Sequence, residues 1–340
     1  MRVLVTGGTG FVGSHTVAAL IEKGHDVRLL VRSPDRIAPA LEPLGVGKVD
    51  SIVGDITDAN VVERAMEGCQ AVLHAAAVYS LDGREAKRIR ETNVRGTDLV
   101  LGTAVRLGLD PIVYVSTGGA LLPPNDEVLT TDSPVKAPKG AYIGSKAEAE
   151  KVARKYQGDG APIVITYPTG VWGPHDPHFG ESSRLAAAVL KGQFPMLPSG
   201  GFQVVDVRDV AQVNVAVMEA GRGPRRYLAA GTYMDVKELV LALAEVTGRN
   251  LPTRTVPARY LMPVGRLADL AQRVLPFRLP LNFEGFYFLS LEAHYDDSRT
   301  RQELGYVPRD PRDTFTDTIR WLLEAGHISP KQAGKLTTAS

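Results

Sequence analysis

A glycine-rich turn near the start of the chain constrains the fold more than any other feature of the sequence. Residues 6–13 read TGGTGFVG, and they join a short β-branched run to a helical pattern. In that context Gly7 permits a tight turn, Gly10 lets the backbone approach a phosphate, and Gly13 lets the helix pack closely. The helix start adds N–H groups and the positive end of a dipole. The turn therefore predicts a site for the pyrophosphate of a dinucleotide. Its residues are Gly7, Thr9, Gly10, Phe11, Val12 and Gly13.

Two hydrophobic periods alternate through the first half of the chain. The runs typical of strands lie at 2–6, 26–31, 49–53, 71–74, 112–116 and 162–167. The helical patterns between them lie at 11–23, 58–67, 84–107 and 141–156. This alternation predicts βαβ units with right-handed crossovers. The expected fold class is therefore α/β, a doubly wound parallel sheet of the Rossmann type with a smaller mixed C-terminal lobe.

The rhythm of strands and helices breaks after Pro168, where Pro and Gly become frequent. We expect a dinucleotide-binding domain over 1–170, with its sheet completed by about 202–230. A substrate-binding lobe is expected from 171–201 and 231–328. The polar residues 329–340 are expected to form a frayed tail.

The segment 257–291 has an uneven apolar load that allows two interpretations. We favour a helix that packs onto the second lobe, because Pro263, Pro276 and Pro280 interrupt any long membrane helix. The alternative is an amphipathic segment that touches a membrane surface or gates the substrate.

Charge and cysteine content exclude several classes of protein. The 340 residues contain 39 Lys and Arg against 38 Asp and Glu, and the formal net charge of +1 is too small to attract nucleic acid. Cys69 is the single cysteine, which excludes an intramolecular disulfide and a cysteine-rich metal site. No apolar run is long enough for a membrane span, and the first predicted strand leaves no room for a signal peptide. We expect a cytoplasmic protein that acts on a small molecule.

The end of the second predicted strand bears on cofactor choice. A dinucleotide site that prefers NAD usually has a carboxylate there, about 20 residues after the glycines, for the ribose 2′-hydroxyl. This chain has Arg32, whose guanidinium can bind a 2′-phosphate. NADP(H) is therefore favoured, and NAD(H) remains possible because Asp35 is close in sequence. Asp55 and Ile56 are expected near the adenine, and Ala75, Ala76 and Ala77 on the path to the nicotinamide.

Four polar residues suggest acid–base chemistry. Tyr142 and Lys146 stand four apart at the start of a predicted helix, so both side chains lie on one face. A phenol exchanges protons poorly at neutral pH unless a nearby cation stabilises the phenolate, and a lysine one turn away supplies that cation. A hydroxyl pair, Ser116 and Thr117, ends the fifth predicted strand beside the expected nicotinamide.

The chain resembles the extended short-chain dehydrogenase/reductases, within the NAD-dependent epimerase/dehydratase superfamily. Most similar is the branch of dihydroflavonol reductases and 3β-hydroxysteroid dehydrogenases. The matching segments are residues 6–13, 55–56, 93–97, 114–117, 142–146, 168–174, 206–210 and 304–308. Two positions depart from common patterns: Tyr167 stands where many relatives have Arg, and Gly118-Gly119 replace the acidic pair of sugar dehydratases.

The resemblance implies an NADP(H)-dependent oxidoreductase that interconverts a carbonyl and an alcohol on a moderately bulky, apolar substrate. Tyr142 would be the general acid/base, and Lys146 would lower its pKa and hold the ribose. Thr117, or alternatively Ser116, would contact the substrate oxygen. Pro168 and Val171 would border the cofactor, Asn93 would support the site, and a homodimer is possible.

The expected wall of the substrate site is aromatic. Its members are Tyr79, Trp172, His175, Phe179 and Phe202. His175 and His178 are both expected to line the pocket. They are not expected to bind a metal, because Pro177 between them argues against a helix. Two other functions remain open: an NAD-dependent nucleotide-sugar epimerase, and a non-catalytic module that senses NADP.

Overall fold

The computed structural model describes residues 1–78, 85–123, 128–136, 138–194, 196–271 and 283–337. Its centre is a seven-stranded sheet in the order β10-β6-β5-β4-β1-β2-β3, and all neighbouring strands in it are parallel. The strands are β1 (Arg2–Thr6), β2 (Asp26–Val31), β3 (Asp50–Val53), β4 (Ala71–His74), β5 (Ile112–Val115), β6 (Ile163–Pro168) and β10 (Arg225–Ala229). This confirms the predicted doubly wound α/β fold.

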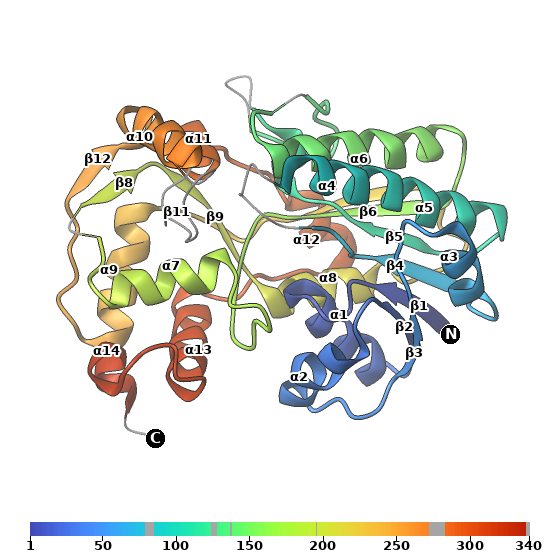
Figure 1. The fold of residues 1–340 in the computed structure, drawn as a ribbon, viewed down its shortest axis with the longest axis horizontal. Helices are drawn as coiled ribbons and strands as arrows, with labels where there is room; N and C mark the ends of the chain where they lie inside the picture. The colour runs from blue at the N-terminus through green and yellow to red at the C-terminus, as the bar shows by residue number, and fades with distance from the viewer. Residues whose placement is uncertain (79–84, 124–127, 137, 195, 272–282, 338–340) are drawn as a thin grey trace.

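Helices cover both faces of this sheet (Figure 1). The alternation of side chains along β1 shows why: Val3 and Val5 pack with residues of α1 and α8, whereas Leu4 packs with residues of α3, α5 and α6 on the opposite face. The helices are α1 (Phe11–Glu22), α2 (Ile37–Leu41), α3 (Ala59–Met66), α5 (Gly96–Arg106), α6 (Ala141–Gly158) and α8 (Val207–Ala216). The strand order reverses between β1 and β4, and ligands bind at such a switch point.

The helix predicted over 84–107 has an irregular middle. It consists of α4 (Ala86–Arg90), a π-helical turn over Glu91–Arg95, and α5. Wide turns of this kind often occur at functional sites.

The second lobe contains two small sheets and its own core (Figure 1). One sheet has the order β11-β9-β7, and the other pairs β12 with β8. The elements are β7 (Gly170–Trp172), α7 (Glu181–Leu190), β8 (Leu197–Ser199), β9 (Gly201–Asp206), β11 (Thr232–Asp235), α9 (Val236–Thr247), β12 (Thr255–Pro257), α10 (Ala258–Ala271), α11 (Phe283–Leu291), α13 (Pro311–Glu324) and α14 (Pro330–Ala333). The helix α12 (Ser298–Leu304) instead packs on β10 of the main sheet and on α8.

Two predicted boundaries of this lobe need correction. Of the region 202–230, only β10 joins the main sheet, because β9 pairs with β7 and β11 instead. The expected frayed tail is ordered over 329–337: Ser329 caps α14 in a capping box, and Ala333 is fully buried. Residues 338–340 lie outside the described residues.

The apolar segment 257–291 forms a pair of helices in its described parts. α10 and α11 pack against each other, and α11 also contacts β8 and β9, as the favoured interpretation predicts. α10 nevertheless leaves four apolar side chains exposed: Tyr260, Val264, Leu267 and Leu270. Among the helices of the described ranges, none combines the length and apolarity needed to cross a bilayer.

Candidate active site

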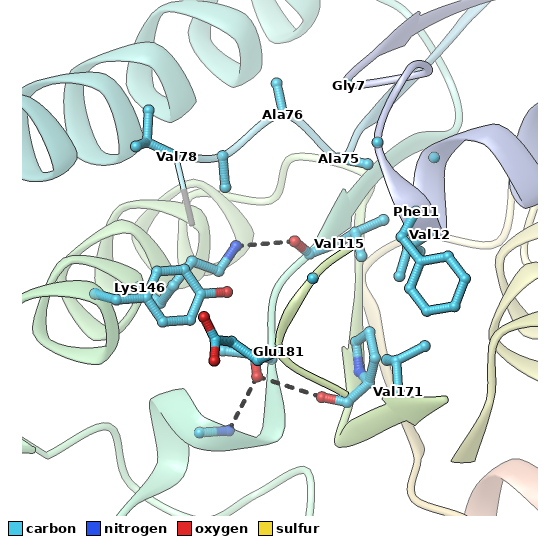
Figure 2. Close-up of a pocket in the computed structure, with 18 of the residues that line it drawn as sticks. Gly7, Phe11, Val12, Ala75, Ala76, Val78, Val115, Lys146, Val171 and Glu181 are labelled. Carbon is cyan, nitrogen blue, oxygen red and sulfur yellow. Dashed lines mark hydrogen bonds between the residues drawn. The ribbon is translucent and has the colours of Figure 1, made fainter. Parts of the chain in front are cut away.

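A cavity of about 790 Å³ lies at the carboxyl ends of the main strands and extends to the second lobe (Figure 2). Its lining joins the glycine turn to the ends of β2, β4, β5 and β6, the start of α6, and parts of β7, β9, α7 and α11. Most of the residues predicted for the site meet there. They are Gly7, Thr9, Gly10, Phe11, Val12, Gly13, Arg32, Asp55, Ile56, Ala75, Ala76, Ala77, Ser116, Thr117, Tyr142, Lys146, Pro168, Val171 and Phe202.

The glycine turn is packed so closely that side chains would not fit in it. Gly7 has φ +75°, and a Cβ there would lie 2.6 Å from the backbone of Ala75 and Ala76. A Cβ on Gly13 would lie 2.0 Å from the carbonyl oxygen of Gly7. The start of α1 carries no side-chain cap and no acidic residue in its first turn. This cradle fits the pyrophosphate of a dinucleotide, whose charge would meet the helix N-terminus.

Basic side chains line the cavity beyond β2. Arg32 and Arg36 are both exposed and both belong to the lining. Asp35 is not part of that lining among the described residues. Asp55 lines the cavity too, where its carboxylate accepts hydrogen bonds from the amide and hydroxyl of Thr57 at 2.9 and 2.7 Å. The cavity thus offers positive charge beside the end of β2.

The loop after β4 is held from the π-helical turn. The buried Asn93 accepts a hydrogen bond from the amide of Val78 at 2.7 Å and donates one to its carbonyl oxygen at 3.1 Å. The side-chain amide of Asn93 also donates a hydrogen bond to the hydroxyl of Ser145 on α6 at 2.9 Å. Asn93 therefore ties the alanine loop to the helix that carries Tyr142 and Lys146.

The hydroxyl pair after β5 divides into a buried and an accessible member. Ser116 is buried, whereas Thr117 is half-buried. The Thr117 hydroxyl donates to the carbonyl oxygen of Pro168 at 3.3 Å and accepts from the amide of Gly119 at 3.2 Å. Gly118 and Gly119 are crowded as well, since a Cβ would lie 2.9 Å from the Tyr295 ring and 2.7 Å from Ile143 respectively.

The electrostatics of Tyr142 and Lys146 differ from the prediction. Burial, and next the negative charge of Glu284, raise the pKa of Tyr142. Burial lowers the pKa of Lys146 to about 8, and the ammonium group donates to the carbonyl oxygen of Val115 at 3.0 Å. The expected lowering of the Tyr142 pKa by Lys146 is therefore wrong for this structure, because desolvation dominates and the lysine is bonded to β5.

The predicted aromatic wall is largely wrong. Trp172 is 1% exposed and packs edge-to-face on Phe315, because consecutive side chains of β7 point to opposite sides and Val171 takes the cavity side. His175 faces Trp321 instead, and Phe179 stacks on His327 with ring centroids 4.0 Å apart. Neither His175 nor Phe179 belongs to the cavity lining, whereas His178 and Phe202 do. Tyr79 lies outside the described residues.

Sequence reasoning missed the part of the wall that comes from late in the chain. These lining residues are Gln203, Phe288, Leu289, Ala293 and Tyr295. The run 286–289 is apolar in the sequence, but no local motif indicates that it lines the cavity. Long-range packing puts these side chains opposite Thr117 and Tyr142.

Comparison with known proteins gives consistent results. The model of the NAD dependent epimerase/dehydratase family matches residues 3–230. "Sterol demethylase protein B" of Methylococcus capsulatus is 31% identical, over 96% of this chain and all of that protein. A "putative dihydroflavonol 4-reductase" of Synechocystis is also 31% identical, over 95% of each chain.

Solved structures share the same architecture. The structure of gox2253 has a TM-score of 0.81 at 28% identity and covers 96% of this chain and 99% of its own. DesIV, a dTDP-glucose 4,6-dehydratase from Streptomyces venezuelae solved with NAD and TYD bound, has a TM-score of 0.75 at 27% identity. It covers 97% of this chain and 100% of its own.

Proposed function

The chain belongs to the NAD dependent epimerase/dehydratase family, as its sequence motifs indicate, and it is an NAD(P)-binding oxidoreductase of that family. On that premise we propose that it uses NADP(H) to interconvert a carbonyl and an alcohol on a moderately bulky, largely apolar substrate. One observation carries the proposal: Thr117, Tyr142 and Lys146 share a cavity with the glycine turn and with an apolar wall.

The protein's own groups have separate roles in this reaction. Hydride exchange with the substrate carbon is the chemistry that a nicotinamide supplies when bound. Tyr142 donates the proton to the substrate oxygen during reduction, and the phenolate removes it during oxidation. Thr117 donates a hydrogen bond to that oxygen, and Lys146 holds the ribose. The glycine turn holds the pyrophosphate, and Arg32 with Arg36 binds the 2′-phosphate.

The lining beyond the hydroxyl pair supports an apolar substrate. Phe202, Phe288 and Leu289 supply hydrophobic surface, and Tyr295 closes the space beside Gly118. The proteins named as a sterol demethylase component, a dihydroflavonol reductase and a hydroxysteroid dehydrogenase suggest ring ketones as trial substrates. We therefore propose a panel with a 3-ketosteroid, a dihydroflavonol and acetophenone.

The Tyr142→Phe variant tests the proposal on that panel. Loss of the acid–base hydroxyl is expected to lower turnover at least about 100-fold, with NADPH affinity within about threefold of wild type. Equal turnover by the variant and the wild type would refute the role of Tyr142. NADPH binding without hydride transfer to any panel member would favour a sensing module. The predicted homodimer is measured separately, by light scattering of the purified protein.

A nucleotide-sugar epimerase is the second candidate. Arg88 and Arg184 line the cavity, where each pairs with a carboxylate of the same lining, Glu85 at 2.9 Å and Glu181 at 3.7 Å. A diphosphate would compete with these carboxylates for the two guanidinium groups. Gly118 and Gly119 stand where sugar dehydratases carry an acidic pair, and side chains there would displace Tyr295 and Ile143, so we do not propose dehydration. Interconversion of UDP-glucose and UDP-galactose, with NAD that stays bound during purification, would favour the epimerase.

We also propose that α10 touches an anionic membrane surface. Tyr260, Val264 and Leu267 recur at helical spacing and are 62%, 45% and 67% exposed. Arg259 and Arg266 are exposed on the same helix, and its one acidic residue, Asp269, bonds to the backbone of α11. Apolar and basic side chains together suit the headgroup region of an anionic bilayer.

A further inference from the structure

Helix α6, which carries Tyr142 and Lys146, begins without a cap of its own. Its N-cap position is Gly140, with φ +128°, and no side-chain cap or acidic residue lies in its first turn. The first amides of a helix have no partner inside the helix, and Ser, Thr, Asp or Asn usually accepts from them. The start of α6 therefore needs an acceptor from elsewhere in the chain.

Glu284 supplies that acceptor from the second lobe. It lies in the first turn of α11, is 6% exposed, and accepts a hydrogen bond from the amide of Ile143 at 3.1 Å. Its carboxylate also faces the amides of Ala141 and Tyr142. A residue 141 positions away in sequence thus takes the place of a local cap.

The glycine at the N-cap matches this arrangement. A Cβ on Gly140 would lie 2.3 to 2.7 Å from the atoms of the Glu284 carboxylate. Any other residue at position 140 would displace the carboxylate or the start of α6. The absence of a side chain at Gly140 therefore leaves the space that the Glu284 carboxylate occupies.

The charge of Glu284 acts on Tyr142 as well as on the helix. Burial raises the pKa of Glu284 to about 7, and Asp269 on α10 adds to this, whereas the three amides of α6 oppose it. Among the described residues, Tyr114 on β5 interacts electrostatically with Tyr142, and Lys146 lies one turn further along α6. Glu284 is the group whose charge raises the pKa of the Tyr142 phenol.

We propose that Glu284 is a positioning residue for Tyr142. Its carboxylate fixes the start of α6 and ties it to α11, the helix whose Phe288 and Leu289 line the substrate part of the cavity. Through this contact, a substrate that packs against α11 affects where α6 holds the Tyr142 hydroxyl. The inference rests on the proposed function of Tyr142.

The test compares Glu284→Gln, Glu284→Ala and a matched control. The amide of Gln keeps an acceptor oxygen for the helix amides but removes the charge. Asp310→Asn makes the same chemical change at the exposed N-cap of α13, a helix that supplies no lining residue among the described ones. The pH dependence of kcat/KM for the best panel substrate, in the oxidative direction, reports the pKa of the free enzyme's base.

We expect the midpoint of that pH profile to move down by about half a pH unit in Glu284→Gln, because less negative charge faces the phenol. Glu284→Ala should also lose about tenfold in kcat with unchanged NADPH affinity, since the phenol is no longer held in place. Asp310→Asn should change thermal stability alone.

An unchanged midpoint in Glu284→Gln, or an equal shift in Asp310→Asn, overturns the inference. If Glu284→Ala does not fold, the midpoint of the pH profile of Glu284→Gln still tests the inference. The failure of the proposed function is distinguishable: in that case Tyr142→Phe keeps wild-type turnover. If Tyr142→Phe is inactive while Glu284→Gln matches the wild type in midpoint and rate, only the role of Glu284 is refuted.

Discussion

The ammonium group of Lys146 donates a hydrogen bond to the carbonyl oxygen of Val115, with 3.0 Å between the two atoms (Figure 2). This bond joins α6 to the end of β5, the strand that leads into Ser116 and Thr117. It also buries a charge, since Lys146 is 4% exposed and burial lowers its pKa to about 8.

Replacing Lys146 with Met should separate activity from stability. Turnover is expected to fall at least about 100-fold, because the group proposed to hold the cofactor ribose is lost. The folded-state pKa lies below that of the unfolded chain, so wild-type stability rises as pH rises from about 8 towards 10.5. Denaturant unfolding at pH 7 and pH 10 should show that this rise is smaller in Lys146→Met. An equal rise in both proteins would contradict the burial argument.

Thr117 and Ser116 can be distinguished by paired substitutions. Thr117→Val keeps the shape but removes the accessible hydroxyl, and kcat/KM is expected to fall about 100-fold. Ser116→Ala removes the buried hydroxyl, and the expected loss is less than about fivefold. Steady-state kinetics of both variants on one panel substrate show which substitution causes the larger loss of kcat/KM. The reverse order would assign the substrate contact to Ser116.

Arg32 should control the choice between NADPH and NADH. Fluorescence titration of cofactor-stripped protein is expected to show NADPH bound at least about tenfold tighter, equivalent to about 1.4 kcal/mol. Arg32→Ala should remove most of that preference and leave NADH affinity unchanged, because NADH has no 2′-phosphate. Equal binding of both cofactors by the wild type would show that Arg32 does not read the phosphate, and would favour an NAD-linked dehydrogenase or epimerase.

Acid should destabilise the protein through His74. This buried side chain lies 2.7 Å from the Thr6 hydroxyl and 3.1 Å from the Thr97 hydroxyl, and burial lowers its pKa to about 3. The unfolded chain gains a proton below pH 6.5 while the folded state does not, so stability falls as pH falls. Between pH 7 and pH 5 the expected loss is about 2 kcal/mol. Unfolding curves at both pH values should show a smaller loss in His74→Gln; an identical loss would contradict this assignment.

Contact of α10 with membranes should depend on both its apolar and its basic side chains. The wild type is expected to sediment with phosphatidylglycerol vesicles, and Leu267→Gln or Arg266→Gln should weaken this binding about threefold or more. Leu241→Gln is the control, because Leu241 is 49% exposed on α9, away from α10. Equal binding to phosphatidylcholine and phosphatidylglycerol vesicles would refute the proposal, and so would equal binding by Leu267→Gln and the wild type.

The parallel sheet was predictable because its signals are local. Strands such as β2 and β4 have the bounds that the apolar runs 26–31 and 71–74 predict, and the glycine turn marks β1 and α1. The second lobe was harder to predict. β9 pairs with β7 and β11 rather than extending the main sheet, and nothing in its own sequence specifies those partners.

The sequence by itself determined the doubly wound fold and most of the residues that line the cavity beside the glycine turn, because backbone geometry, strand period and helix spacing act over a few residues. The tertiary structure decided which side chains of the second lobe line the cavity. Val171 lines the cavity while Trp172 lies in the core, since the partners of β7 set which of its faces is covered. Glu284 reaches the start of α6 across 141 positions, a contact that exists only once the two lobes have packed together.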